Sequence, residues 1–296
     1  MKKLIDPRMP VWYFGVYHSV NWSVTVKLGA IDYLNCYPFY YHMLEKKPVK
    51  GVDIVPAIPS ELNRMLKSGE LDMSPVSSAV YTELQDEVTL LREFCLSSVG
   101  YVRSVVLIST MPIEYLNGKK VGLSTSSQTS VALLKILLQK YYGLQPEYVS
   151  SPPFPELDEL DAALVIGNDA MLPMKQKIPY IYDLGDLWMR HTGHPVVFAV
   201  FALRNDSAVQ WKGEINDVLA SYRESLLCLD KERDDIILNA GRRYPILESD
   251  DLDIYYHLLK FNFTQGLKKA LQFYYDEAAQ LGLMPEVPGI RFADLQ

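Results

Sequence analysis

The chain of 296 residues has a net charge of −7, with 49% hydrophobic and 22% charged residues, which is the composition of an ordinary globular protein. The acidic balance, without any basic tract, argues against nucleic acid as a partner, because lysine and arginine must offset the phosphates. No apolar run approaches the roughly 20 residues of a membrane span, so the sequence predicts no membrane partner.

The cysteines indicate a reducing environment. Cys36, Cys95 and Cys228 lie far apart and form no C-x-x-C pair, so neither a disulfide framework nor a cysteine zinc site is predicted. At the N-terminus, Asp6-Pro7-Arg8 interrupts what would otherwise resemble a signal peptide. We therefore expect a cytoplasmic protein.

Residues 1–24 are rich in aromatic side chains but have neither strand alternation nor a helical period. We interpret them as an N-terminal extension of the fold. Two alternatives stay open: the extension packs on the surface, or the true start of the protein lies further along the chain.

From residue 24 onward, strands alternate with helices, a pattern that predicts an open, largely parallel sheet. Pro38 suits the first turn of a helix, Ser60 is expected to cap the next one, and Gly69 to end it. The expected strands are 24–31, 51–58, 71–76, 90–94 and 101–109, and the expected helices are 38–44, 61–67 and 80–84.

A second unit begins near Thr110. Its expected strands are 120–123, 147–150, 161–167, 180–184 and 194–203, with a helix at 131–142 that Gly143 ends. Beyond Asn205 helical patterns dominate, at 215–229, 231–238, 252–261 and 267–280, and no strand is expected there.

The simplest architecture is α/β with two lobes. Residues 25–105 and 203–296 are expected to form lobe 1, and residues 106–202 lobe 2, with crossing strands near 104–109 and 198–203. The C-terminal helices then pack on lobe 1. A ligand cleft is expected between the lobes, where strand ends and helix N-termini converge.

The strongest local signal is a run of hydroxyl side chains between a predicted strand and a predicted helix. Free backbone N–H groups at such a helix start, together with the hydroxyls, can hold a carboxylate or phosphate without a formal positive charge. One N-cap needs only one such residue, so the run favours anion binding over mere capping. Its members are Ser124, Thr125, Ser126, Ser127, Thr129 and Ser130.

Four further polar residues follow predicted strands or lie within them. Asn35 lies where the first strand gives way to its helix, although an Asn near a Pro is also a common turn residue. Ser77 and Ser78 end the strand at 71–76, and Ser104 lies within the first presumed crossing strand.

Cofactor and metal signatures are absent from the sequence. It contains no P-loop, G-x-S-x-G or G-x-G-x-x-G motif. His191 and His194 resemble a metal pair, but Gly193 and Pro195 break the helix that would align them. We expect neither a metal nor a cofactor.

Taken in order, these segments resemble the chorismate dehydratase family of menaquinone biosynthesis. The resemblance runs from about residue 27 to residue 284. It rests on the segments 31–38 (Ile-Asp-Tyr-Leu-Asn-Cys-Tyr-Pro), 69–72 with 75–78, 104–109, 126–134, 162–167, 183–185 with Trp188, and 192–199.

The resemblance implies a two-lobed fold like that of the type II periplasmic binding proteins. It implies loss of water from chorismate, giving 3-[(1-carboxyvinyl)oxy]benzoate on the futalosine route. The catalytic positions that it implies are Asn35 and Ser104. Implied at the substrate are Ser77, Ser78, Thr125, Ser126, Ser127, Thr129, Ser130, Gly167 and Asn168.

Two comparisons sharpen this expectation. Asn168 stands where the family usually has Asp, so a polar role is retained there and a charged one is not. The sister enzyme dihydroxynaphthoate synthase shares the fold, but its Ser-Pro-x-Pro-Asp-type segment is not found at 33–38.

The matched segments hold no well-placed His or Glu to act as a base. Asp32 and Asp183 are the nearest carboxylates in sequence, and either can equally cap a turn. We hypothesise that the substrate's own side-chain carboxylate is the base. The alternatives are a non-catalytic small-carboxylate binding protein or sensor of the same fold, and another enzyme acting on a related carboxylated substrate. The sequence leaves the oligomeric state open.

Overall fold

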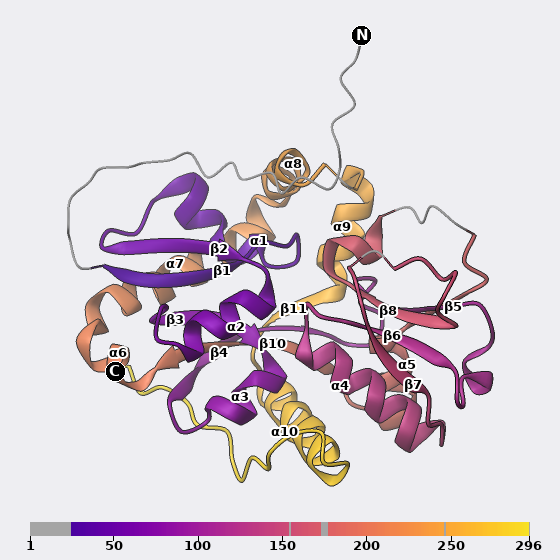
Figure 1. Ribbon diagram of the computed structural model, residues 1–296. Coiled ribbons are helices and arrows are strands. Elements are labelled where there is room, and N and C mark those ends of the chain that lie inside the picture. Colours follow the sequence, from indigo (N-terminus) through magenta and orange to yellow (C-terminus); the bar gives the residue numbers. More distant parts are fainter. Residues whose placement is uncertain (1–24, 154, 173–176, 246, 296) are drawn as a thin grey trace.

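The computed structural model describes residues 25–153, 155–172, 177–245 and 247–295; the predicted extension 1–24 lies outside them. Two separate β-sheets form the framework (Figure 1). The first has the order β11-β4-β10-β3-β1-β2, with β1 (Val26–Ile31), β2 (Val52–Ala57), β3 (Met73–Ser77), β4 (Val88–Ser98), β10 (Val196–Arg204) and β11 (Leu259–Asn262). The second has the order β7-β6-β8-β5-β9, with β5 (Val105–Ser109), β6 (Lys120–Ser124), β7 (Glu147–Ser151), β8 (Ala162–Ile166) and β9 (Tyr180–Asp183).

Helices flank both sheets. They are α1 (Tyr37–Tyr41), α2 (Pro59–Lys67), α3 (Ser78–Leu84), α4 (Gln128–Ile136), α5 (Leu184–Thr192), α6 (Asn205–Gln210), α7 (Lys212–Lys231), α8 (Arg233–Arg243), α9 (Ser249–Leu258) and α10 (Gln265–Gln280). Single π-helical turns extend α1 over His42–Lys46 and α4 over Leu137–Tyr141. No helix in the described ranges is long and apolar enough to cross a membrane.

Both sheets are mixed, which corrects the expectation of a largely parallel sheet. Strand β1 pairs in parallel with β2 and β3, whereas β10 runs antiparallel to β3 and β4. In the second sheet β6 is parallel to β7 and β8, and β5 is antiparallel to β8 and β9. Strands β10 and β5 run opposite to their neighbours. The alternation of residues along a strand does not reveal its direction, so the sequence could not predict this.

Strand β10 lies in the middle of the first sheet, between β4 and β3. Its residues are buried on both faces, which explains the long apolar run in the sequence. The boundary expected at 202–203 falls inside β10, which belongs to the first sheet over its whole length. The chain therefore re-enters the first sheet at Val196, before the expected boundary.

Three local expectations are wrong. Strand β11 exists beyond Asn205, where only helices were expected, because the predicted helix 252–261 ends at Leu258 and the next residues alternate between buried and exposed. Helix α2 begins at Pro59, so Ser60 is not its cap. The expected strand 101–109 begins only at Val105.

The C-terminal helix α10 contacts helices that flank both sheets. The expectation that it packs on lobe 1 is therefore incomplete. The Tyr274 hydroxyl donates to the Thr129 carbonyl at 3.1 Å. The buried Glu277 carboxylate accepts from Lys140 Nζ at 2.6 Å and from the Tyr141 hydroxyl at 2.8 Å. In Figure 1, α10 accordingly lies beneath the junction of the two sheets, and it holds the two halves together.

Candidate functional site

A small cavity lies between the two sheets, at the ends of β1, β3, β5 and β8. Its volume is about 50 Å³, room for a few water molecules. Its described lining contains no charged side chain. Six of the predicted site residues line it, namely Asn35, Ser77, Ser104, Ser127, Ser130 and Gly167.

On the side of the first sheet, the turn after β1 carries Tyr33 and Asn35 into the cavity wall. The Leu34 N–H donates to Asn168 Oδ1 of the other half at 3.1 Å, which fixes this turn. The Oδ1 atom of Asn35 is buried and has no hydrogen-bond partner among the described residues. Helix α1 has only five residues before its π-helical turn. An anion beside Asn35 would therefore meet the side-chain amide rather than the dipole of a long helix.

Ser104 is held in an unusual backbone setting. Arg103 has φ of 64°, the only positive φ at a non-glycine residue in the described part of the chain. Such a conformation is unfavourable for a residue with a Cβ and persists only where its surroundings enforce it. Arg103 lies in the connection between β4 and β5 and directly precedes Ser104, which lines the cavity.

Asp183 enforces that turn. Its Oδ2 accepts from the N–H groups of Val102 and Arg103 at 3.0 and 2.7 Å, and its Oδ1 accepts from those of Gly185 and Asp186 at the start of α5. Burial raises the pKa of Asp183, and these four bonds oppose that effect. The carboxylate is thus engaged by backbone groups, which favours a structural role over that of a base.

The hydroxyl run divides its members between different tasks. Ser127 is the N-cap of α4, and its Oγ accepts from the Ser130 N–H at 3.3 Å. The Ser127 and Ser130 hydroxyls lie 3.2 Å apart in the cavity wall. Ser127 therefore caps α4, and the same pair of residues also lines the cavity.

The other predicted site residues do not line the cavity. Thr129 Oγ1 accepts from the Ala79 N–H at 3.0 Å, so it joins the two halves. The Ser78 hydroxyl donates to the Val197 carbonyl at 2.7 Å. Ser126 is buried, with its N–H bonded to Ser124 Oγ, and Thr125 is exposed. Asn168 acts through its bond to the Leu34 N–H.

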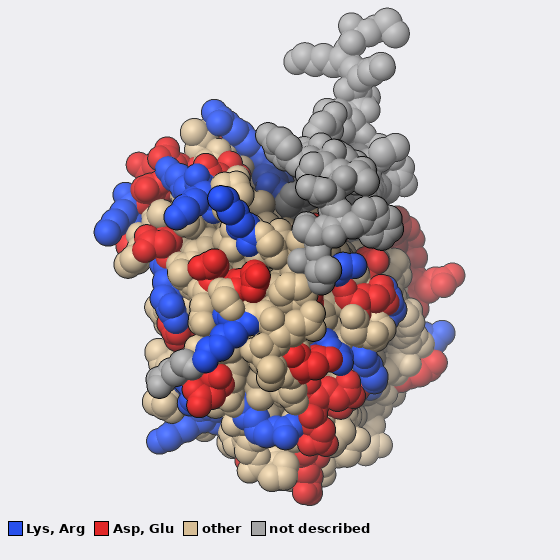
Figure 2. Space-filling model, turned by 90° about the vertical axis from the view of Figure 1, so that its left-hand side faces the viewer, with Lys and Arg blue, Asp and Glu red and all other residues tan. Residues whose placement is uncertain are grey.

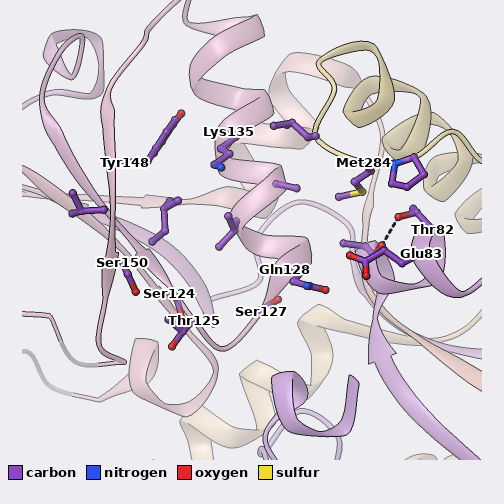
Figure 3. A pocket seen from close by; sticks show the side chains of 17 residues that line it. Thr82, Glu83, Ser124, Thr125, Ser127, Gln128, Lys135, Tyr148, Ser150 and Met284 are labelled. Atoms are coloured by element: carbon purple, nitrogen blue, oxygen red, sulfur yellow. Dashed lines mark hydrogen bonds between the residues drawn. The ribbon is translucent and has the colours of Figure 1, made fainter. Parts of the chain in front are cut away.

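A larger open groove of about 600 Å³ lies beside the cavity, and Ser127 borders both. Figure 3 shows the Ser124, Thr125 and Ser127 hydroxyls at one end of it and Lys135 at the other. Lys135 Nζ lies 5.1 Å from the Tyr148 ring centroid. We call this space the lateral groove.

Sequence reasoning missed two residues near the cavity, Tyr33 and Asp169. A Cβ at Gly167, which has φ of +65°, would lie 2.8 Å from the Tyr33 ring, so the two halves touch closely there. Burial raises the pKa of Tyr33 to about 12, and the charge of Asp169 adds to this. Tyr33 stands within the quoted 31–38 motif, which was the signal that could have identified it.

Burial also raises the pKa of Asp169 to about 6. The folded state therefore favours the protonated acid, and stability falls as the pH rises from about 4 to about 6. Because the carboxyl is partly exposed, we expect Asp169→Asn to stabilise the protein at pH 8 by only about 1 kcal/mol.

Thermal melts at pH 4 and pH 8 measure this effect. The gain should be present at pH 8 and small at pH 4. The same change at the exposed Asp158 controls for the loss of one charge. Equal gains in both variants, or a gain at Asp169 that does not depend on pH, would contradict the assignment.

On the face seen in Figure 2, Lys and Arg are interspersed with Asp and Glu, so positive charge is not concentrated there. An anion in the cavity would meet amide, hydroxyl and backbone donors rather than a lysine or arginine.

Comparisons with known proteins identify the family. A family model described as menaquinone biosynthesis matches residues 26–280. Chorismate dehydratase of Thermus thermophilus is 37% identical over 61% of this chain and 70% of its own length. The 1,4-dihydroxy-6-naphtoate synthase of the same organism is 22% identical over 61% of this chain and 66% of its own.

Solved structures identify the fold. A protein from Archaeoglobus fulgidus superposes with a TM-score of 0.73 at 22% identity, covering 89% of this chain and all of that one. The periplasmic aliphatic sulphonate binding protein of Escherichia coli gives 0.66 at 14% identity, covering 92% of each chain. The fold is therefore that of the periplasmic binding proteins, as expected.

Proposed function

Because the chain belongs to the menaquinone biosynthesis family, we propose that it is a chorismate dehydratase. It would act as a hydro-lyase in the cytoplasm and convert chorismate to 3-[(1-carboxyvinyl)oxy]benzoate on the futalosine route. The observation that carries the proposal is the meeting of Asn35, Ser104 and the Ser127–Ser130 pair in one cavity between the halves, together with 37% identity to a curated chorismate dehydratase.

Substrate entry requires the two halves to separate. A cavity of about 50 Å³ is too small for a substituted ring with two carboxylates. Opening would break the bonds from the Leu34 N–H to Asn168 and from the Ala79 N–H to Thr129. Closure over the substrate then excludes water and strengthens each remaining polar contact.

Binding of the dianion relies on neutral donors. The start of α4 offers backbone N–H groups and the Ser130 hydroxyl to one carboxylate. Asn35 and Ser104 line the same cavity and suit the second polar group. Asn168 in place of the family's usual Asp keeps a polar contact and adds no negative charge to repel the substrate.

The reaction removes one ring proton and the hydroxyl on the adjacent carbon. The C–H electron pair becomes a ring double bond as the C–O bond breaks, and the proton and hydroxide leave as water. We propose that the side-chain carboxylate of the substrate takes the proton, since a base held against its target has a high effective molarity. The engagement of Asp183 by four backbone N–H groups supports this choice, as does the bond from the Tyr244 hydroxyl to Asp32.

We expect Ser130→Ala to raise KM for chorismate by roughly 10–100-fold, because a hydrogen bond to a charged group contributes about 1.5–3 kcal/mol. Its backbone N–H still reaches Ser127, so the cap survives. Lys135→Ala is the matched control, since it removes the cation of the lateral groove from the same helix. An increase of KM in the Lys135 variant alone would move substrate binding to the lateral groove.

The rival function is a carboxylate-binding protein or sensor of the same fold. A thermal-shift assay with chorismate, followed by product analysis, separates the two, because a binder is stabilised and returns its ligand unchanged. We expect chorismate to stabilise chelator-treated protein and to lose one water in the same incubation. Chelated protein that is inactive and recovers with a divalent metal would contradict cofactor-free catalysis.

A further inference from the structure

Two consecutive tyrosines of α10 hydrogen-bond to the two helices that begin at the cavity. The Tyr274 hydroxyl donates to the carbonyl of Thr129, in the first turn of α4, at 3.1 Å. The Tyr275 hydroxyl donates to the carbonyl of Ser78, the first residue of α3, at 2.8 Å. Both tyrosines are buried, and in Figure 1 α10 lies beneath α3 and α4. One helix therefore engages a helix from each half of the molecule.

The rings of the two tyrosines divide between the halves in the same way. The Tyr275 ring stacks on Tyr81 of α3, with the ring centroids 6.1 Å apart. The Tyr274 ring packs edge-on against Trp188 of α5, also with 6.1 Å between the centroids. Burial raises the pKa of both phenols. Each hydroxyl therefore keeps its proton at neutral pH and remains a hydrogen-bond donor.

A third hydrogen bond joins α3 and α4 directly. The Ala79 N–H donates to Thr129 Oγ1 at 3.0 Å. Ala79 is the second residue of α3, where a backbone N–H has no acceptor within its own helix. Thr129 thus accepts from α3 through its hydroxyl and from α10 through its carbonyl. The three helices are therefore bonded pairwise.

These bonds lie where both helices meet the cavity. Ser77 directly precedes α3, and the Ser127–Ser130 pair begins α4; all three residues line the cavity. We propose that Tyr274 and Tyr275 are positioning residues, which set the separation of these two parts of the cavity wall when the halves are closed. The link through α10 needs both of its ends, so the loss of either bond removes it. Its effect on turnover rests on the proposed function, whereas the link itself does not.

Hydrogen exchange at the Ala79 amide, followed by NMR, tests the link without substrate. That N–H is bonded only across the two helices, so its exchange reports their contact. Tyr274→Phe and Tyr275→Phe should each speed its exchange by roughly 5–10-fold, the change that corresponds to the loss of one hydrogen bond. The double variant should exchange no faster than either single variant, while its melting temperature falls further.

Turnover of chorismate tests the consequence for the site. Substrate should still bind the cavity donors in both single variants, but it is held less precisely between them. We therefore expect kcat to fall by roughly tenfold and KM to change by less than about threefold, because small misplacements cost more in the chemical step than in binding. The double variant should have the kcat of the single variants.

The matched control is Tyr40→Phe. The buried Tyr40 hydroxyl also donates to a backbone carbonyl, that of Gly29 at 3.2 Å, but both residues belong to the half built on the first sheet. This variant should lose stability as the other single variants do. Its Ala79 exchange and its kcat should equal those of the wild type, since no bond between the halves is lost.

Three outcomes would overturn the assignment. Ala79 exchange that is unchanged in either single variant, or equally fast in Tyr40→Phe, removes the link. Faster exchange with an unchanged kcat leaves the link without a part in positioning. Losses of kcat that multiply in the double variant show that Tyr274 and Tyr275 act separately. Wild-type protein that leaves chorismate unchanged refutes the proposed function, and the Ala79 exchange then still decides whether the link exists.

Discussion

Asn35→Ala should reduce kcat by about 10²–10³-fold, the range measured when a preorganised donor to a developing charge is removed. Among the described residues that line the cavity with Asn35, none is charged, so few other groups can take over its task. KM should rise less than kcat falls, since the start of α4 still holds one carboxylate of the substrate.

Asp32→Asn, compared with Asn35→Ala, tests whether the protein supplies the catalytic base. The new amide oxygen can still accept from the Tyr244 hydroxyl, as Asp32 does, and we expect measurable turnover, within about tenfold of the wild type. Asp183→Asn should also turn over, with lower stability, because an amide cannot accept all four backbone N–H groups. An enzymatic base typically contributes about 10²–10⁴-fold. A thousandfold loss in either variant that still binds chorismate would make that aspartate the base.

The second large effect is expected at Gly167→Ala. The new Cβ would lie 2.8 Å from the Tyr33 ring, and the residue would keep a φ of +65°. Since the ring belongs to the other half of the molecule, the halves must separate slightly to make room. We expect kcat/KM to fall by roughly 100-fold or more, because a 1 Å misplacement can cost that much.

Gly143→Ala is the control that separates the strain of a left-handed backbone from the steric clash with the Tyr33 ring. Gly143 has φ of +67°, and its Cβ would meet nothing within 4 Å. Both variants should lose about 1–2 kcal/mol of stability from the left-handed backbone, whereas only Gly167→Ala should lose activity. Equal kinetics in the two variants would show that the contact between Tyr33 and Gly167 has no part in closure.

The sequence predicted which segments border the cavity better than the contacts of each residue. The hydroxyl run predicted a helix start that does border the cavity, but not which of its hydroxyls line it. Ser130 does, while Thr129 bonds to Ala79 instead. The direction of one side chain depends on how the two halves dock, and local sequence does not encode that docking.

Other features depend on contacts between distant parts of the chain. Tyr256 belongs to no motif, and only the docking of α9 brings its hydroxyl to the Leu34 carbonyl beside Asn35. The turn at Arg103 requires Asp183 to bind its backbone from another segment. Strand β11 was missed because its four residues follow a helix directly, and pairing with β4 decides their conformation.

The central claim is that the enzyme holds a substrate that carries its own base, and one rate constant tests it most directly. Single-turnover chemistry should be measured at saturation with chorismate and with an analogue whose side-chain carboxylate is a neutral amide. We predict that chorismate loses one water, while the bound analogue stays unchanged over many half-lives of that reaction. An analogue that dehydrates at a rate comparable to that of chorismate would contradict the claim and return the base to the protein.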